Sequence, residues 1–113
     1  MTANYYIIPG ITTAPSSEKQ STLPKIEKAI CVYTGIDADV IYSGYRKREV
    51  VFARHLIMYF CRKKTNLTFQ EIGQHFGYDH TTTLHGCRKI AGFLDIKDFV
   101  TCKAVEEIEM LIR

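Results

Sequence analysis

Residues 68–85 have the sequence features of two helices joined by a tight turn, and this segment constrains the fold more than any other. Thr68 and Glu71 have the spacing of a capping box, in which each side chain caps the backbone N–H of the other residue. Gly77 can adopt the left-handed conformation that ends a helix, and Asp79 has the position of a second N-cap. In a helix-turn-helix, the residues after that second N-cap face base edges in the major groove of DNA. The segment therefore predicts a helix-turn-helix.

Helical periodicity also dominates outside this segment, so the chain predicts an all-α fold, a compact helical domain with brief connections. Pro24 is acceptable in the first turn of a helix, and Gly35 is suited to the end of that helix. The longest helix is largely apolar and is expected to form the central scaffold. The expected helices span residues 24–33, 37–43, 49–64, 69–76, 80–94 and 97–113.

The chain divides into three expected parts. Residues 1–21 are rich in Pro, Gly, Ser and Thr, which is typical of a flexible N-terminal tail, with one apolar patch at residues 5–8. Residues 22–95 are expected to form the helix-turn-helix domain, and residues 96–113 an additional C-terminal helix. The last two helices each have an apolar stripe that is expected to face the core, namely Leu84, Cys87, Ala91 and Leu94, and Val100, Ala104, Ile108 and Leu111.

Composition and charge narrow the range of functions. A chain of 113 residues is one domain. No apolar run approaches the roughly 20 residues of a transmembrane helix, and the N-terminus lacks a secretory pattern, so a cytoplasmic, nucleoid-associated location is expected. The net charge is only +3, but eleven of the fifteen Lys and Arg residues lie between Lys25 and Asp95. This distribution is typical of a protein that binds a polyanion, although an ordinary solvated surface could share it.

Several kinds of chemistry are not expected. The four cysteines are widely spaced, which favours reduced thiols over a zinc site. The chain has no phosphate-binding loop of the form G-x-x-x-x-G-K-[ST], so neither nucleotide binding nor ATP-driven work is expected. His75, His80 and His85 are accompanied by no paired nucleophile or carboxylate dyad, which argues against an enzyme. No cofactor and no metal is therefore predicted.

A longer stretch around the helix-turn-helix resembles a known family. The residues that carry the resemblance are Arg46-Lys47-Arg48-Glu49-Val50-Val51, Ala53-Arg54-His55, Ile72-Gly73, Phe76-Gly77, Asp79-His80-Thr81-Thr82 and Leu84-His85-Gly86-Cys87-Arg88-Lys89-Ile90. Over about residues 26–94 the chain closely resembles the C-terminal DNA-binding domain (domain IV) of DnaA, the bacterial replication initiator. The resemblance implies a Trp-repressor-like helical fold that binds double-stranded DNA sequence-specifically.

The first turn of the second helix supplies the expected base contacts. Threonine hydroxyls can hydrogen-bond to bases, and threonine methyl groups can pack on the thymine methyl group. His80 can donate to a base acceptor, and the resemblance implies that Asp79 accepts from a cytosine amino group. Such a cluster is also typical of a helix cap that has no part in binding. With the resemblance, we expect base contacts from Asp79, His80, Thr81 and Thr82.

Basic residues elsewhere are expected to contact the minor groove and the DNA backbone. The resemblance implies that Arg46, in a basic loop, enters an A/T-rich minor groove, where the narrow walls concentrate negative potential. It also implies that Arg54 binds a phosphate. A solvated charged surface is the alternative for these residues, and the helix dipole alone can explain Arg62 near the end of its helix. The expected phosphate contacts are Lys47, Arg48, Arg54, His55, Arg62, His85 and Lys89.

The chain departs from the family at three places. Only Tyr78 separates Gly77 from Asp79, so the turn is about one residue shorter than usual and lacks the family's basic side chain. Tyr78 could stack or hydrogen-bond in its place. Ala53 stands where the family commonly has Pro, and Thr83 stands where it commonly has Val, which adds a hydroxyl at a packed position. The fold is expected to tolerate these changes, whereas the DNA sequence preference need not be kept.

Two classes of function stay open. The favoured one is specific binding of DnaA-box-like duplex sites by a stand-alone domain. Its role would be in replication or transcription regulation, or as the DNA-targeting part of a phage or mobile element. The other is a helical adaptor that kept the fold and binds a protein through residues 97–113 or 5–8; residues 97–113 could also mediate self-association. Retention of Asp79-His80-Thr81-Thr82 beside Arg46 and Arg54 favours DNA, since an adaptor has no evident need of that set.

Overall fold

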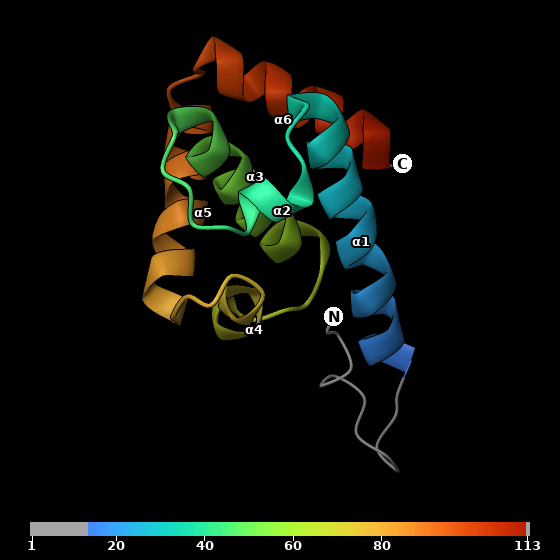
Figure 1. The fold of residues 1–113 in the computed structure, drawn as a ribbon. Helices are drawn as coiled ribbons and strands as arrows, with labels where there is room; N and C mark the ends of the chain where they lie inside the picture. Colours follow the sequence, from blue (N-terminus) through green and yellow to red (C-terminus); the bar gives the residue numbers. More distant parts are fainter. Residues whose placement is uncertain (1–13, 113) are drawn as a thin grey trace.

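Residues 14–112 are described by a computed structural model, with side chains described from residue 22 onwards. This part of the chain is all helical, without strands, as the sequence predicts (Figure 1). The elements are α1 (Ala14–Thr34), α2 (Ala38–Ile41), α3 (Arg48–Lys64), α4 (Phe69–Gln74), α5 (His80–Asp95) and α6 (Phe99–Ile112).

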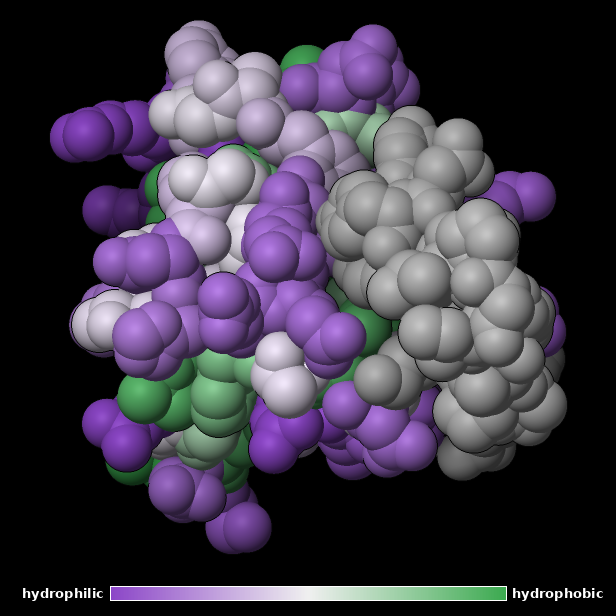
Figure 2. All heavy atoms as spheres, turned by 90° about the horizontal axis from the view of Figure 1, so that it is seen from below, coloured by the Kyte–Doolittle hydropathy of each residue, from purple (hydrophilic) through white to green (hydrophobic). Residues whose placement is uncertain are grey.

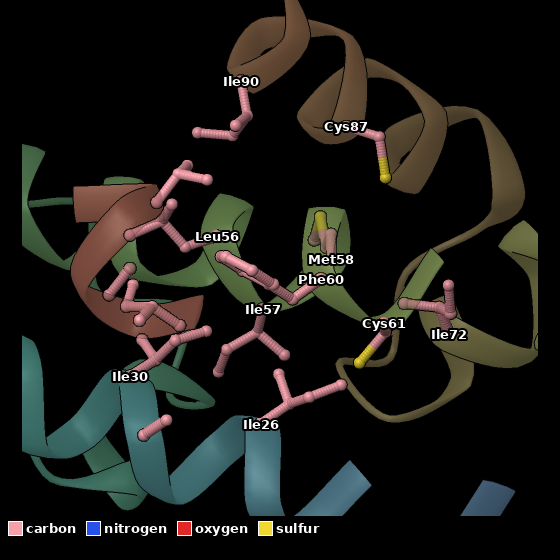
Figure 3. Packing of buried hydrophobic residues seen from close by; sticks show 14 of the residues in the cluster. Ile26, Ile30, Leu56, Ile57, Met58, Phe60, Cys61, Ile72, Cys87 and Ile90 are labelled. Atoms are coloured by element: carbon pink, nitrogen blue, oxygen red, sulfur yellow. The ribbon is translucent and has the colours of Figure 1, made fainter. Parts of the chain in front are cut away.

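Helix α3 is the central scaffold, as predicted, because the other helices pack around it. Its buried side chains include Leu56, Ile57 and Phe60, which lie in the core between α1 and α5 (Figure 3). Fully burying an apolar side chain of this size contributes roughly 1.5–3 kcal/mol relative to leaving it exposed. The surrounding helices contribute Ile26 and Ile30 from α1, Ile72 from α4, Cys87 and Ile90 from α5, and Ala104, Val105 and Ile108 from α6.

Helix α1 begins ten residues before the predicted start, so Pro24 lies inside it. The prediction used Pro24 as a helix start because proline in a helix interior normally costs about 3 kcal/mol. Here the side chains on both sides of the proline pack on the core, with Leu23 partly buried and Ile26 fully buried. The predicted tail is therefore wrong for residues 14–21, which are helical, and residues 1–13, including the apolar patch at 5–8, lie outside the described residues.

Two predicted apolar stripes need correction. On α5, Ala91 is exposed and Leu84 only half-buried, while the buried stripe comprises Thr83, Gly86, Cys87 and Ile90. On α6, Val100 and Leu111 are exposed, and the buried stripe comprises Thr101, Ala104, Val105 and Ile108. Both alternatives have helical spacing, so the spacing could not decide which face of the helix is turned inward.

The arrangement brings the predicted helix-turn-helix to one end of the molecule. Helix α4 and the first turn of α5 lie together at the lower end in Figure 1, whereas α6 crosses the opposite end. The loop between α2 and α3 carries Arg46 and Lys47 and leads into the exposed first residue of α3, Arg48. Within the described residues, no helix is both long enough and apolar enough to cross a membrane.

Candidate nucleic-acid interface

The capping box predicted at the start of α4 is present. The Glu71 N–H donates to Thr68 Oγ1 at 3.1 Å, and the Thr68 N–H donates to Glu71 Oε1 at 2.8 Å. The other end of the short helix is closed through Gly77, whose φ of 75° lies in the left-handed region. The Tyr78 N–H donates to the Gly73 carbonyl at 2.9 Å and the Gly77 N–H to the Gln74 carbonyl at 3.4 Å, which is the Schellman pattern. The backbone N–H groups at the end of α4 and in the turn, from His75 to Tyr78, are therefore all hydrogen-bonded.

Gly73 allows the turn to lie directly on α4. A Cβ atom at this position would lie 2.6 Å from the Tyr78 carbonyl oxygen and 2.8 Å from Thr83 Oγ1. Two of the nearest atoms, the carbonyl oxygens of Tyr78 and Asp79, belong to the backbone and cannot rotate away. The approach of α4 to the start of α5 therefore requires glycine. Sequence reasoning missed this role, although a glycine inside a short helix is a recognised sign of close packing.

Stacking was one of two roles expected for Tyr78, and its ring does stack, but on an aromatic ring of the protein itself. Its ring lies parallel to that of Phe76 at a centroid distance of 5.9 Å, and Phe76 in turn stacks on Tyr42 at 4.7 Å. The side chain is half-buried against the core. Tyr78 thus fixes the turn and does not supply a charge where the family has a basic residue.

The first turn of α5 presents four exposed polar side chains, those of Asp79, His80, Thr81 and Thr82. Asp79 is the N-cap, because its Oδ1 accepts from the Thr82 N–H at 2.9 Å. This hydrogen bond to the Thr82 backbone lowers the pKa of Asp79, so the carboxylate is charged at neutral pH. Seen from below, the coloured part of this end is mostly hydrophilic (Figure 2).

Thr83 faces inward and is completely buried. Its hydroxyl donates to the Asp79 carbonyl oxygen at 3.2 Å, one turn earlier in the helix. A buried hydroxyl costs little when it is hydrogen-bonded, so the family's valine is replaced here without an unsatisfied polar group. The four residues before Thr83 are thereby held on the outer side of α5.

The basic loop is held from inside by Arg54. This side chain is only 4% exposed, and its Nε donates to the Ile41 carbonyl at 2.8 Å while one Nη donates to the Tyr45 carbonyl at 3.1 Å. Arg54 thus joins the end of α2 to the residue before Arg46, whose own side chain is exposed. The two bonds to the loop are observed, whereas the phosphate contact of Arg54 stays a prediction.

The remaining predicted phosphate contacts on α3 and α5 fall into two groups. His85 and Lys89 are both exposed and lie on one face of α5. The Lys89 ammonium lies 5.8 Å from the centre of the Phe93 ring. His55 is half-buried, and a Cβ atom on Gly86 would lie 2.9 Å from its ring. Burial and then the nearby His85 lower the pKa of His55 to about 4, so it is neutral at physiological pH. His55 therefore packs between α3 and α5 in its neutral form, and its phosphate contact stays a prediction.

Arg62, Lys63 and Lys64 at the end of α3 already have partners within the chain. Arg62 donates to the Leu67 carbonyl at 3.0 Å and lies over the Phe69 ring, 4.8 Å from its centre. Lys63 and Lys64 both pair with Glu109 of α6, at 2.9 and 2.7 Å. These contacts connect the scaffold to α4 and α6. A phosphate contact by Arg62 remains a prediction.

The structure thus combines a polar helix start, a basic loop held by buried hydrogen bonding and an exposed basic helix face, which are features expected of a surface that binds a polyanion. In the described part of the chain, no three His, Cys, Asp or Glu side chains are grouped so that they could hold a metal ion. The cysteines described are unpaired thiols, and Cys61 and Cys87 are buried in the core.

Comparison with known proteins gives the family. The family described as the bacterial DnaA protein helix-turn-helix matches residues 23–90. The chain is similar to chromosomal replication initiator proteins DnaA. The DnaA protein of Synechococcus sp. is 39% identical over 82 residues, which is 72% of this chain and 18% of that protein. The DnaA protein of Bacteroides thetaiotaomicron is 35% identical over 96 residues, which is 84% of this chain and 20% of that protein. The DnaA protein of Corynebacterium aurimucosum is 41% identical over 76 residues, which is 66% of this chain and 14% of that protein. The chain spans between 14% and 20% of the length of these relatives, and it belongs to the bacterial DnaA helix-turn-helix family.

Proposed function

We propose that this protein binds double-stranded DNA sequence-specifically, at sites that resemble DnaA boxes, without ATPase activity in this domain. The observation that carries the proposal is the first turn of α5, where four polar side chains are exposed on a tightly fixed backbone. An exposed helix start of this kind fits the major groove, where a Thr hydroxyl and methyl group can distinguish base pairs. Membership of the DnaA family supports the same conclusion.

The roles of the four residues follow from their contacts. Asp79 uses Oδ1 to cap the helix, so its second oxygen is available to accept from a cytosine amino group. His80 and Thr81 lie beyond the cap with exposed side chains and are the main base-contacting residues. Thr82 is exposed as well, with its backbone N–H engaged by the cap. Because the cap and the turn already fix the backbone, little backbone conformational entropy is lost when these residues bind DNA.

The basic loop is proposed to place Arg46 in the neighbouring minor groove. An arginine there gains most where the groove is narrow and A/T-rich. The two hydrogen bonds of the Arg54 side chain hold the loop before binding, so we assign Arg54 to positioning in addition to its predicted phosphate contact. The exposed side chains of Lys47, Arg48, His85 and Lys89 would contact phosphates, which orient the protein without reading sequence. We propose regulation of replication or transcription as the biological setting.

The experiment is a fluorescence anisotropy titration of a duplex with a DnaA box against a shuffled duplex, at low and moderate salt. We expect tighter binding to the box, and a log–log salt slope that reports the number of phosphates contacted. Arg46→Ala should weaken binding to the box by roughly 1–3 kcal/mol. Lys25→Ala is the matched control, because it removes the same charge from an exposed position on α1, outside the basic loop.

Three results distinguish the proposal from its alternatives. Equal, weak and steeply salt-dependent binding to both duplexes would leave only nonspecific affinity. Equal losses for Arg46→Ala and Lys25→Ala would remove the specific role of the basic loop. Binding to neither duplex would overturn the DNA proposal and favour the helical adaptor.

A further inference from the structure

The outward face of α6 is apolar at both of its ends and charged in its middle. Four large apolar side chains on it, Phe99, Val100, Met110 and Leu111, are between 49% and 76% exposed. Between them lie Lys103 and Glu107, which form an exposed pair at 3.7 Å. The opposite face of α6 is fully occupied by the core, as Ala104 and Ile108 are buried. The outward face is therefore a surface of its own, made of these six residues.

The order of these residues is symmetric about Val105. Phe99 and Leu111 lie six residues before and after it, Val100 and Met110 five, and Lys103 and Glu107 two. The members of the first two pairs are alike in character, and those of the third are opposite in charge. A surface of this kind is self-complementary under a two-fold axis at its centre, which is the requirement for an isologous dimer contact.

We propose that two copies of this protein associate through the outward face of α6, with the two helices antiparallel. In this arrangement Val100 of one copy meets Met110 of its partner, and Phe99 meets Leu111. Lys103 of each copy lies opposite Glu107 of the other, so two ion pairs form between the copies at the centre. A parallel arrangement would instead bring like charges together, which is unfavourable. Apolar contact at both ends and ion pairs at the centre thus select one orientation.

The size of the surface sets the strength of the association. Helix α6 has 14 residues and is therefore about 21 Å long. One helix face of this length is small beside the roughly 800 Å² per partner of a standard stable interface. The dimer is accordingly weak, and it forms at high local concentration, for example where several copies stand close together. This proposal goes beyond DNA binding and does not depend on it.

The position of α6 has a consequence that rests on the proposed function. The first turn of α5 and helix α6 lie at opposite ends of the molecule (Figure 1). Two copies joined through α6 therefore leave both helix-turn-helix ends uncovered and directed away from each other. Such a dimer can hold two DNA sites at once.

The test is sedimentation velocity of the whole chain without DNA, at concentrations up to about 1 mM, where a weak dimer is still populated. We expect a reversible dimer for the parent chain. Lys103→Glu and Glu107→Lys should each raise the dissociation constant about tenfold or more, because both central pairs become repulsive. Mixed in equal amounts, these two variants should associate again, since every central pair is then of opposite charge.

The mixing experiment separates contact between chains from the ion pair within one helix, which mixing cannot restore. Val100→Asn should also weaken the dimer, whereas Val32→Asn on α1 is a control at an equally exposed valine and should not. Circular dichroism checks that each variant remains folded. A parent chain that stays monomeric, or variants that fail to associate when mixed although the parent dimerises, would overturn the proposal. Because no DNA is present, neither result bears on specific DNA binding.

Discussion

The two ends of α5 are built on the same backbone motif and expose opposite kinds of side chain. At its start, Gly77 in the left-handed region precedes the capping residue Asp79. At its end, Lys97 has a φ of 57°, and Asp98 caps α6 by accepting from the Thr101 N–H at 3.0 Å. Both turns have the same pair of Schellman hydrogen bonds.

The difference lies in the residues that follow each cap. After Asp79 come His80, Thr81 and Thr82, whereas Phe99 and Val100 come after Asp98, and all five are exposed. Backbone geometry alone therefore does not decide what a helix start binds. A polar start fits a hydrated, charged polymer such as DNA, whereas an apolar start fits another protein surface.

The largest effect is expected from a substitution of Gly73, which lies against the start of α5 and not against its end. Gly73→Ala forces apart α4 and the turn, and it should lower the free energy of unfolding by about 2–3 kcal/mol. Urea denaturation followed by circular dichroism measures this change. Gly92→Ala is the matched control, since a Cβ atom there meets nothing within 4 Å and the substitution should stabilise α5 by about 0.5–1 kcal/mol. Equal effects of the two substitutions would contradict the close approach.

Arg54 is the next most sensitive position. Arg54→Met leaves the carbonyls of Ile41 and Tyr45 without this donor, and we expect a loss of about 2 kcal/mol in unfolding free energy. Arg88→Met, at an exposed position on α5, should change it by less than about 0.5 kcal/mol. An Arg54 variant as stable as the Arg88 variant would mean that the loop does not depend on the buried guanidinium.

The two turns can be compared directly through their left-handed residues. Gly77→Ala should cost about 1–2 kcal/mol, because a Cβ atom is disfavoured in this conformation. Lys97→Gly should instead stabilise the protein by less than about 1 kcal/mol, since the strain is relieved while the unfolded chain gains freedom. Thermal unfolding of both variants tests the comparison. Two changes of the same sign would show that the turns are not equivalent.

The smallest effect is expected from the protonation of Asp79. Its pKa is lowered in the folded state, so the charged cap stabilises the fold above the ordinary Asp pKa, and this stabilisation is lost as pH falls through the lowered value. Asp79→Asn keeps a capping group without the titration. The stability difference between the parent chain and Asp79→Asn should therefore shrink at acidic pH. A difference that is independent of pH would argue against a charged cap.

The parts that the sequence predicted correctly depend on neighbouring residues. The capping box at Thr68, the left-handed Gly77 and the N-cap Asp79 are each determined within four residues. The features that escaped prediction depend on contacts far apart in the chain. The burial of Arg54 is set by carbonyls nine and thirteen residues earlier, which no local pattern shows.

The buried faces of two helices and the start of α1 also differ from the sequence prediction. Spacing allowed two overlapping stripes on α6, and only the packed fold selects the one with Thr101 and Val105. Likewise, Pro24 predicted a helix start by local rules, but packing on the core carries α1 through the proline. The roles of the site residues on DNA remain predictions, because they depend on a partner.

The central claim is that the first turn of α5 reads base pairs, and Thr81→Ala tests it most directly. Dissociation constants are measured by anisotropy for the DnaA-box and shuffled duplexes, at one salt concentration, for the parent chain and the variant. We expect the preference for the box to fall by roughly 1–3 kcal/mol in the variant, while affinity for the shuffled duplex is unchanged. An unchanged preference, or equal weakening on both duplexes, would contradict the claim.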